Sequence, residues 1–172
     1  MEETQEQKTG TGDFGFQPVT DREILRGKID KKVFHLVGAA ADALGRECYV
    51  GGGYVRDLML QRHSKDIDFV TVGSGIEVAQ LVAKKLKGSH LSVYKNFGTA
   101  QVCNRVHELE FVGARKESYH RESRNPIVED GTLEDDISRR DFTINAMALC
   151  VNGGQDTHAR TYCPVCQPRP LR

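Results

Sequence analysis

An acidic pair and a run of glycines lie close together in this sequence, and both suit phosphate chemistry. Asp66 and Asp68 are two residues apart in a stretch, 66–72, whose apolar residues predict a strand. Because side chains alternate across a strand, both carboxylates would project from one face. Adjacent carboxylates repel each other unless a cation lies between them, and hard oxygen ligands suit Mg²⁺.

The glycines at positions 51–53 lie between a short apolar strand and a short predicted helix. Gly52 and Gly53 would let backbone N–H groups approach a phosphate. Arg56 falls in the first helical turn, where a cation is disfavoured unless an anion lies nearby. A phosphate cradle beside an acidic pair is the equipment for metal-assisted phosphoryl transfer.

Each half of this arrangement also has a simpler interpretation. A glycine run is usually a flexible turn, and an Asp-x-Asp pair is usually a solvated strand face. The spacing of Arg56 relative to both halves favours the chemical interpretation.

Helices and strands that could position these residues follow from hydrophobic periodicity and turn signals. An apolar stripe predicts a helix from residue 21 to Gly45, and Ser74 with Glu77 has the spacing of a helix cap before a second helix that ends at Gly88. The expected strands are 48–50, 66–72, the hairpin 91–94 with 99–102, and 106–112. Thr132 is expected to cap a short helix, and the segment 113–131 has no clear periodicity.

Two motifs together resemble a known family. Residues 52–57 (GGYVRD), followed by 66–68 (DID), are similar to the signature of the class II tRNA nucleotidyltransferase (CCA-adding enzyme) and bacterial poly(A) polymerase family. Residues 139–146 (RRDFTINA) are similar to the family's Arg-Arg-Asp-x-x-x-Asn-Ala motif, and 133–136 (LEDD) fit the pattern before it. The resemblance extends from about Ile29 to Val151.

The resemblance implies an α+β, polymerase β-like nucleotidyltransferase fold with a mixed sheet and helices packed against it. It implies that Asp66 and Asp68 bind the metal and act in catalysis. Glu110 is the candidate third carboxylate, although an exposed strand glutamate is an equal alternative. The nucleotide-binding residues carried over from the family are Gly52, Gly53, Arg56, Arg140, Asp141 and Asn145. Of these, Asp141 and Asn145 are expected to hold the shape of the site through capping and hydrogen bonds.

The activity implied by the resemblance is template-independent, Mg²⁺-dependent transfer of a nucleotide from CTP or ATP to the 3′-hydroxyl of tRNA. The alternatives are a poly(A) polymerase, or a catalytically silent fragment that binds nucleotide or RNA. In the family, a neck selects the base and further helical domains hold the tRNA. The resemblance covers the head domain only, so the sequence predicts a C-terminally truncated member of the family.

The segment 113–131 carries several basic residues, namely Arg115, Lys116, Arg121 and Arg124. Long irregular segments inside compact domains are usually functional or mobile. The resemblance implies a mobile loop here, which favours contact with nucleotide or RNA phosphate. A solvated loop is the alternative, because Glu117 and Glu122 offset part of the charge.

Composition sets the remaining expectations. The 172 residues include 24 basic and 24 acidic side chains, so net charge gives no sign of a nucleic-acid partner. Five cysteines without framework spacing predict a reducing, cytoplasmic compartment, and no apolar run predicts a membrane span or signal peptide. The expected organisation is a disordered lead-in (1–20), a nucleotidyltransferase domain (21–151) and an unstructured tail (152–172), in which Cys163 and Cys166 are too few for zinc.

Overall fold

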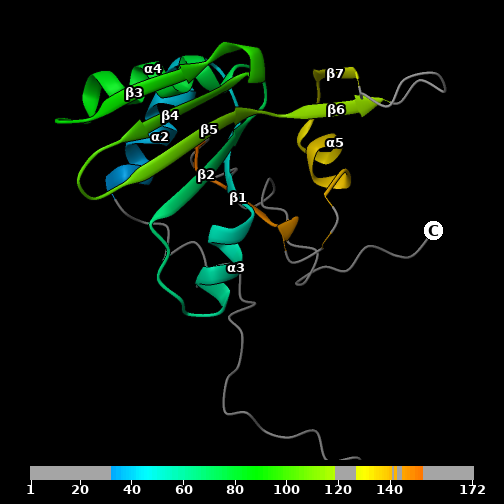
Figure 1. Ribbon diagram of the computed structural model, residues 1–172, viewed down its shortest axis with the longest axis horizontal. Helices are drawn as coiled ribbons and strands as arrows, with labels where there is room; N and C mark the ends of the chain where they lie inside the picture. The colour runs from blue at the N-terminus through cyan, green and yellow to red at the C-terminus, as the bar shows by residue number, and fades with distance from the viewer. Residues whose placement is uncertain (1–31, 119–126, 141, 143–144, 153–172) are drawn as a thin grey trace, which may run out of the picture.

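A mixed six-stranded sheet forms the centre of the computed structural model, which describes residues 32–118, 127–140, 142 and 145–152. The strands, in the order β3-β4-β5-β2-β1-β8, are β1 (Cys48–Gly51), β2 (Asp66–Thr71), β3 (His90–Tyr94), β4 (Thr99–Cys103), β5 (Glu108–Gly113) and β8 (Ala148–Cys150). Only β2 and β5 pair in parallel, and the other neighbours in this sheet are antiparallel. The prediction of a mixed sheet with helices packed against it is therefore confirmed (Figure 1).

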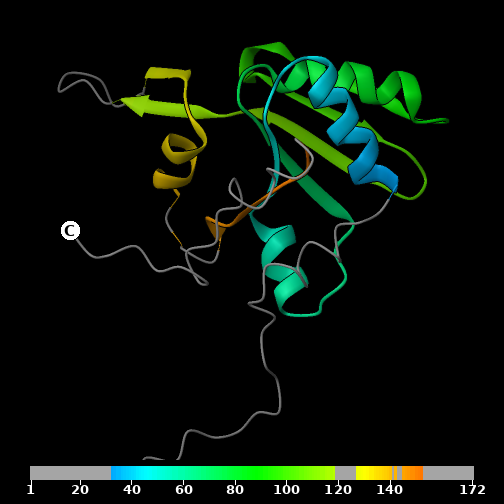
Figure 2. The ribbon, with the colours of Figure 1, turned by 180° about the vertical axis from the view of Figure 1, so that it is seen from behind.

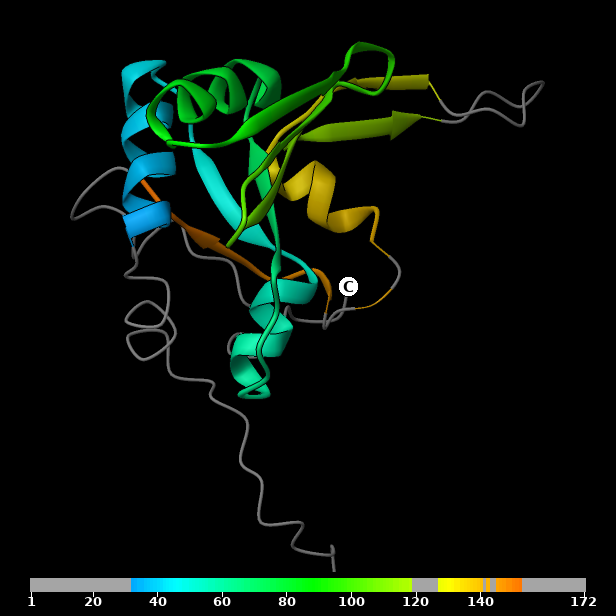
Figure 3. The ribbon, with the colours of Figure 1, turned by 60° about the vertical axis from the view of Figure 1, so that its left-hand side comes forward.

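Two helices, α2 (Lys32–Ala43) and α4 (Gly75–Lys85), cover one face of the sheet (Figure 3). The expected cap of α4 is present, because the Glu77 amide donates to the Ser74 hydroxyl at 3.4 Å. Beneath these helices the ring of Phe69 lies 5.8 Å from that of Phe34 and stacks on Phe111 at 5.1 Å. Burial of each ring stabilises the fold by roughly 1.5–3 kcal/mol.

The alternation predicted for β2 and β5 is also confirmed. Ile67, Phe69, Leu109 and Phe111 are buried against the helices, whereas the acidic residues between them are exposed on the opposite face. The two strands are in register, so their apolar residues meet on one face and their carboxylates on the other.

Helix α5 (Leu133–Ser138) covers part of the opposite face, and a ribbon of β6 (Arg115–Ser118) and β7 (Ile127–Asp130) extends beside the sheet (Figures 1 and 2). Leu133 and Ile137 of α5 pack with Tyr49 and Val70 of the sheet in a second apolar cluster. The short helix α3 (Gly53–Met59) follows β1 and leads towards β2. Within the described residues, no helix has the length and hydropathy needed to cross a membrane.

Two sequence-based expectations were wrong. The segment 113–131 contains β6 and β7, which pair antiparallel, so its described part is a ribbon and not an irregular loop. Polar residues such as Lys116, Glu117 and Glu129 mask the period of these strands. The three-residue strand β8 was not expected, because a run as short as Ala148–Cys150 carries no detectable period. Residues 119–126, with Arg121 and Arg124, lie outside the described residues.

Asn152 also differs from expectation, since it was assigned to the tail but is buried within the domain. Its amide oxygen accepts a hydrogen bond from the Cys48 amide at 3.0 Å, and its Nδ2 donates to Asp42 Oδ1 at 2.9 Å and to the Arg46 carbonyl at 2.7 Å. The side chain thereby joins the end of β8 to the start of β1 and the end of α2. The folded domain therefore includes residue 152, and residues 153–172, with Cys163 and Cys166, lie outside the described part.

Replacing Asn152 by Ala should destabilise the domain, because the buried Cys48 amide would lose its acceptor. An unsatisfied buried donor costs about 1–3 kcal/mol of stability, and each kcal/mol lowers Tm by roughly 2–4 °C at this size, so Tm should fall by roughly 2–12 °C in thermal denaturation followed by circular dichroism. The exposed Asn96 provides the control, and Asn96→Ala should leave Tm within about a degree. Equal Tm values for both variants would contradict the structural role of Asn152.

Candidate active site

The candidate site begins with a row of residues that crosses the open face of the sheet. Gly51 of β1 pairs with Asp68 of β2, Asp68 pairs with Glu110 of β5, and Glu110 pairs with Gln101 of β4. In the neighbouring row, Asp66 pairs with Glu108. The strand register thus brings the acidic pair and Glu110, 42 positions apart in sequence, side by side on one face.

A glycine turn borders this row at the end of β1. Gly52 has φ +64°, a left-handed conformation that favours glycine, and its amide donates to the Met147 carbonyl at 3.0 Å. A Cβ at this position would lie 3.2 Å from Arg140 Nη1 and 3.8 Å from Asp68 Oδ2. The absence of a side chain therefore lets the turn lie between the acidic pair and an arginine.

Two arginines from distant segments meet at Asn145. Arg56 of α3 donates from Nη1 to Asn145 Oδ1 at 3.1 Å, and Arg140 donates from Nη1 to the Asn145 carbonyl at 3.1 Å. Arg56 also pairs with Asp57 at 3.1 Å. One residue therefore fixes both cations at the edge of the glycine turn, where they can bind phosphate oxygens through charge-assisted hydrogen bonds.

Asp136 forms ion pairs with Arg140 and with the adjacent Arg139. Its carboxylate is fully buried, with Oδ1 accepting from Arg139 at 2.8 Å and Oδ2 accepting from Arg140 at 2.9 Å. The helix that carries it begins with the capping box that Thr132 forms with Asp135. Asp136 can thereby fix the orientation of Arg140, whose side chain is still 24% exposed to solvent.

A hollow of about 310 Å³ lies over these groups and is lined by Asp68, Val70, Glu110, Val112, Arg139 and Arg140. Partial burial raises the pKa of Asp68; Arg140 opposes the shift and Asp66 adds to it. Burial, and then the charge of Asp68, raises the pKa of Glu110, while Arg115 opposes that shift. The site therefore concentrates negative charge that is not fully compensated by the protein.

This donor set fits a magnesium ion that binds together with a nucleotide. Asp66, Asp68 and Glu110 offer hard oxygen ligands, but no group of three metal-ligating side chains is assembled among the residues that the structure describes. Mg²⁺ usually binds through one or two carboxylates together with substrate phosphates and water. Asp66 and Asp68 would supply the carboxylates, and the nearby glycine turn and arginines could place the phosphates.

Most residues singled out from the sequence are thus brought together. Asp66, Asp68 and Glu110 share a face, and Gly52, Gly53, Arg56, Arg140 and Asn145 surround one end of their row, whereas Asp141 lies outside the described residues. The sequence did not lead us to place Asp136 or Arg139 in the site. Their spacing, with an acid three and four residues before two arginines on a short helix, was the available signal.

Asp136→Ala should destabilise the domain, because two arginines would lose a buried partner. Removing one member of a buried ion pair lowers the free energy of unfolding by about 3–5 kcal/mol. Because both arginines are partly exposed, we expect a loss of about 3 kcal/mol here. Glu134 lies exposed on the same helix, so Glu134→Ala is the matched control and should leave Tm almost unchanged. Chemical denaturation of both variants would measure the difference, and equal midpoints would contradict the buried pairing.

Asp68→Asn should raise the Tm of the metal-free chain. A folded-state pKa above the ordinary value means that the unfolded chain releases this proton first as pH rises. The folded state therefore loses stability as pH rises from the ordinary pKa of the group to its raised pKa. This loss of stability persists at neutral pH. A neutral amide removes the penalty.

In the presence of Mg²⁺ and a nucleotide, the unmodified chain should instead have a higher Tm than Asp68→Asn. Ligand binding to the folded state should raise the Tm of the unmodified chain but have little effect on Asp68→Asn. Differential scanning fluorimetry at pH 7, with and without Mg²⁺ and ATP, would measure both effects. An equal Mg²⁺-dependent shift in the two proteins would exclude Asp68 as a ligand.

Comparison with known proteins places these features in a family. The model of the family described as "Poly A polymerase head domain" matches residues 48–158, which extends beyond the expected limit at Val151 and leaves α2 outside the match. The "A-adding tRNA nucleotidyltransferase" of Aquifex aeolicus (strain VF5) is 44% identical over 104 residues, which is 60% of this chain and 12% of that protein.

Solved structures agree with the sequence match. A structure titled "The structure of CCA-adding enzyme apo form II" superposes with a TM-score of 0.67 at 35% identity, covering 80% of this chain and 33% of that chain. A tRNA nucleotidyltransferase complexed with a primer tRNA and an incoming ATP analog gives a TM-score of 0.57 at 40% identity, covering 67% of this chain and 31% of that chain.

The predicted polymerase β-like nucleotidyltransferase fold is thereby confirmed. The chain spans 12% to 33% of the length of these three relatives, and the matched region contains the acidic row, the glycine turn and both arginines. The chain belongs to the family of the poly A polymerase head domain.

Proposed function

We propose that this chain carries the catalytic head of a template-independent RNA nucleotidyltransferase. The observation that supports it best is the single row in which Gly51, Asp68 and Glu110 are adjacent, with Arg56 and Arg140 joined at Asn145 beside it. This arrangement combines carboxylates for a divalent cation with cations for a triphosphate.

The proposed substrates are a nucleoside triphosphate, CTP or ATP, and the 3′ end of a tRNA. The relatives named above include A-adding and CCA-adding enzymes, and one was solved with a primer tRNA and an ATP analog. CCA addition or part of it is the activity proposed for this chain. The glycine turn and the acidic pair contact parts common to all nucleotides. These features therefore do not distinguish CCA addition from poly(A) addition.

In the proposed reaction the 3′-oxygen of the RNA forms a bond to the α-phosphorus of the triphosphate. The bond from that phosphorus to the oxygen bridging to the β-phosphate breaks, and pyrophosphate leaves with its electron pair. Arg56 and the Gly52–Gly53 turn hold the triphosphate, and Arg140, fixed by Asp136, holds the nucleotide. Glu110, whose pKa is raised, accepts the hydroxyl proton.

Asp66 and Asp68 would hold Mg²⁺ on the same face. When bound, Mg²⁺ would neutralise phosphate charge and lower the pKa of the attacking hydroxyl. Asn145 has a positioning role, since its side chain and backbone accept from the two arginines.

A cytoplasmic location is part of the proposal and is supported by the cysteines. Among the cysteines of the described residues, Cys48 and Cys103 are free thiols. Burial raises the pKa of Cys48 to about 12, so this thiol stays protonated and unreactive. Reduced, structural cysteines are typical of a reducing compartment.

Asp68→Ala should abolish Mg²⁺-dependent incorporation of labelled ATP or CTP into tRNA that lacks its 3′-terminal nucleotides. Loss of a carboxylate metal ligand should lower the rate by at least about a hundredfold, which corresponds to about 2.7 kcal/mol in the barrier. Glu129, exposed on β7, is the control, and Glu129→Ala should retain activity. Near-normal incorporation by an Asp68→Ala protein would contradict the proposed catalytic role.

The same site should bind the four nucleoside triphosphates with similar affinity. Its described groups are carboxylates, arginines and glycines, which contact phosphates, whereas discrimination needs directional hydrogen bonds to a base edge. Calorimetry with Mg²⁺ should give dissociation constants for ATP, CTP, GTP and UTP within about threefold, a spread below about 1 kcal/mol.

Arg56→Ala should weaken binding of all four nucleotides together. A tenfold preference of the unmodified chain for CTP and ATP would place base selection in the head. Failure of the folded chain to bind any nucleotide would instead favour a catalytically silent fragment.

A further inference from the structure

A carboxylate on the β6–β7 ribbon reaches the arginine pair beside the candidate site. Glu117 of β6 accepts a hydrogen bond from Arg139 Nη1 at 3.4 Å, although the two residues are 22 positions apart. The side chain of Glu117 is 25% exposed and that of Arg139 is 31% exposed, so the pair lies partly out of water. The reaction proposed above gives Glu117 no role.

Arg139 shares its second acidic partner with Arg140. Arg139 donates from Nε and Nη2 to Asp136 Oδ1, at 3.1 and 2.8 Å. Arg140 donates from Nε and Nη2 to Oδ2 of the same carboxylate, at 3.3 and 2.9 Å. Each guanidinium therefore has one carboxylate oxygen. Because the carboxylate is planar and fully buried, a change at one oxygen affects the arginine at the other.

The contacts continue from Arg140 towards the glycine turn. Arg140 Nη1 donates to the Asn145 carbonyl, and Asn145 Oδ1 accepts from Arg56. Glu117 is thus one end of a continuous series of polar contacts that joins β6 to α5 and then to α3. The other end of this series is the arginine assigned to the triphosphate.

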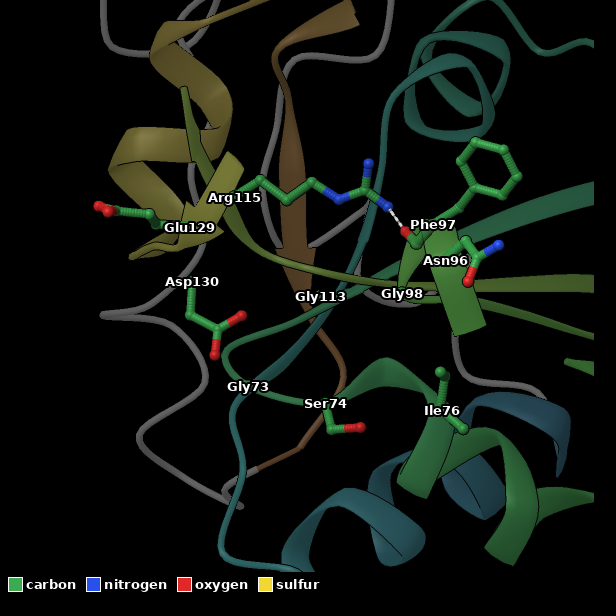
Figure 4. Close-up of a pocket in the computed structure, with 10 residues that line it drawn as sticks. All are labelled: Gly73, Ser74, Ile76, Asn96, Phe97, Gly98, Gly113, Arg115, Glu129 and Asp130. Atoms are coloured by element: carbon green, nitrogen blue, oxygen red, sulfur yellow. Dashed lines mark hydrogen bonds between the residues drawn. The ribbon is translucent and has the colours of Figure 1, made fainter. Parts of the chain in front are cut away.

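The ribbon that carries Glu117 is attached to the sheet at its base. Arg115, the first residue of β6, donates to the Phe97 carbonyl, as Figure 4 shows. The buried Ala114 donates its amide to the Thr71 carbonyl at 2.7 Å and accepts from the Gly131 amide at 2.9 Å. These contacts fix the start of β6 relative to β2, so Glu117 approaches Arg139 from a defined position.

We propose that Glu117 is a positioning residue for nucleotide binding, which acts through Arg139. By accepting from Nη1, Glu117 keeps Arg139 on a single oxygen of Asp136 and leaves the other oxygen to Arg140. This inference rests on the proposed function, in which Arg140 holds the nucleotide.

Without Glu117, the Arg139 guanidinium can turn and pair with both carboxylate oxygens, the bidentate geometry that arginine and carboxylate favour. Arg140 then loses its partner on Asp136 and is no longer held in one orientation. A side chain that must be ordered when the ligand binds lowers the affinity.

The sign of the effect separates positioning from simple electrostatics. Glu117 carries a negative charge, and Arg139 lines the hollow over Asp68 and Arg140. If Glu117 acted only through its charge, its removal would reduce repulsion and tighten the binding of an anionic nucleotide. The positioning role predicts the opposite, namely weaker binding.

The test measures ATP binding by calorimetry in the presence of Mg²⁺. Glu117→Gln should raise the dissociation constant about fivefold, the size of effect expected of a residue that acts through others. Glu117→Asp keeps the carboxylate and should stay within about twofold of the unmodified chain. Exposed ion pairs contribute little to stability, so the Tm of Glu117→Gln should fall by no more than about 4 °C.

Glu129 of β7 gives the matched control, because it is exposed on the same ribbon and lines the separate hollow shown in Figure 4. Glu129→Gln removes the same charge as Glu117→Gln. It should leave the dissociation constant for ATP within about twofold.

A double-mutant cycle tests whether Glu117 acts through Arg139. In Arg139→Gln no second guanidinium competes for Asp136, so adding Glu117→Gln should cause no further loss of ATP affinity. A general structural role of Glu117 in the ribbon would instead give the same loss with and without Arg139. Equal losses in the two backgrounds would therefore overturn the proposal.

The other outcomes are equally distinct. ATP affinity that is unchanged or higher in Glu117→Gln would overturn the positioning role and leave the nucleotidyltransferase proposal intact. Unfolding of Glu117→Gln would also overturn it, since Glu117 would then stabilise the domain as a whole. Failure of the folded, unmodified chain to bind ATP would reject the proposed function itself.

Discussion

The parallel register between β2 and β5 is the constraint on which the site depends. It places Glu110 beside Asp68 and, two residues further along, Val112 beside Val70. A shift of one residue would turn the carboxylates into the core and the apolar residues Phe69 and Phe111 out of it. The core that packs against α2 and α4 therefore also fixes which carboxylates share the open face.

The acidic face is arranged for binding more than for stability. Partial burial and mutual repulsion raise the pKa of Asp68 and of Glu110, so the charged forms are disfavoured without a cation. The buried Asp136 has the opposite role, since its two arginine partners hold the cations next to that face. Carboxyl groups with raised pKa values that share one hollow with arginines are typical of functional sites.

Much of this organisation could be predicted from short-range patterns. Alternation in β2 and β5 identified the face of Asp66, Asp68 and Glu110, and capping residues identified the starts of α4 and α5. The position of Arg56 in the first helical turn singled it out, and the resemblance in two motifs added Arg140, although no local signal shows that Asn145 joins them.

The features that were missed depend on distant partners. Strand β8 exists because β1 offers it an edge, and β6 and β7 are strands because they pair with each other. Asn152 is buried by contacts with Asp42, Arg46 and Cys48, about a hundred positions earlier. Such contacts leave no period in the sequence.

The closure of β1 by β8 has a consequence for the newly made chain. Cys48 and Asn152 are 104 positions apart, so the sheet cannot be completed until residue 152 has left the ribosome. Until then β1 presents an unpaired edge, with apolar Tyr49 and Val50, that can pair with other chains. Non-local pairing of this kind slows folding and lengthens that exposure. The nascent domain is therefore expected to need chaperone protection until β8 is in place.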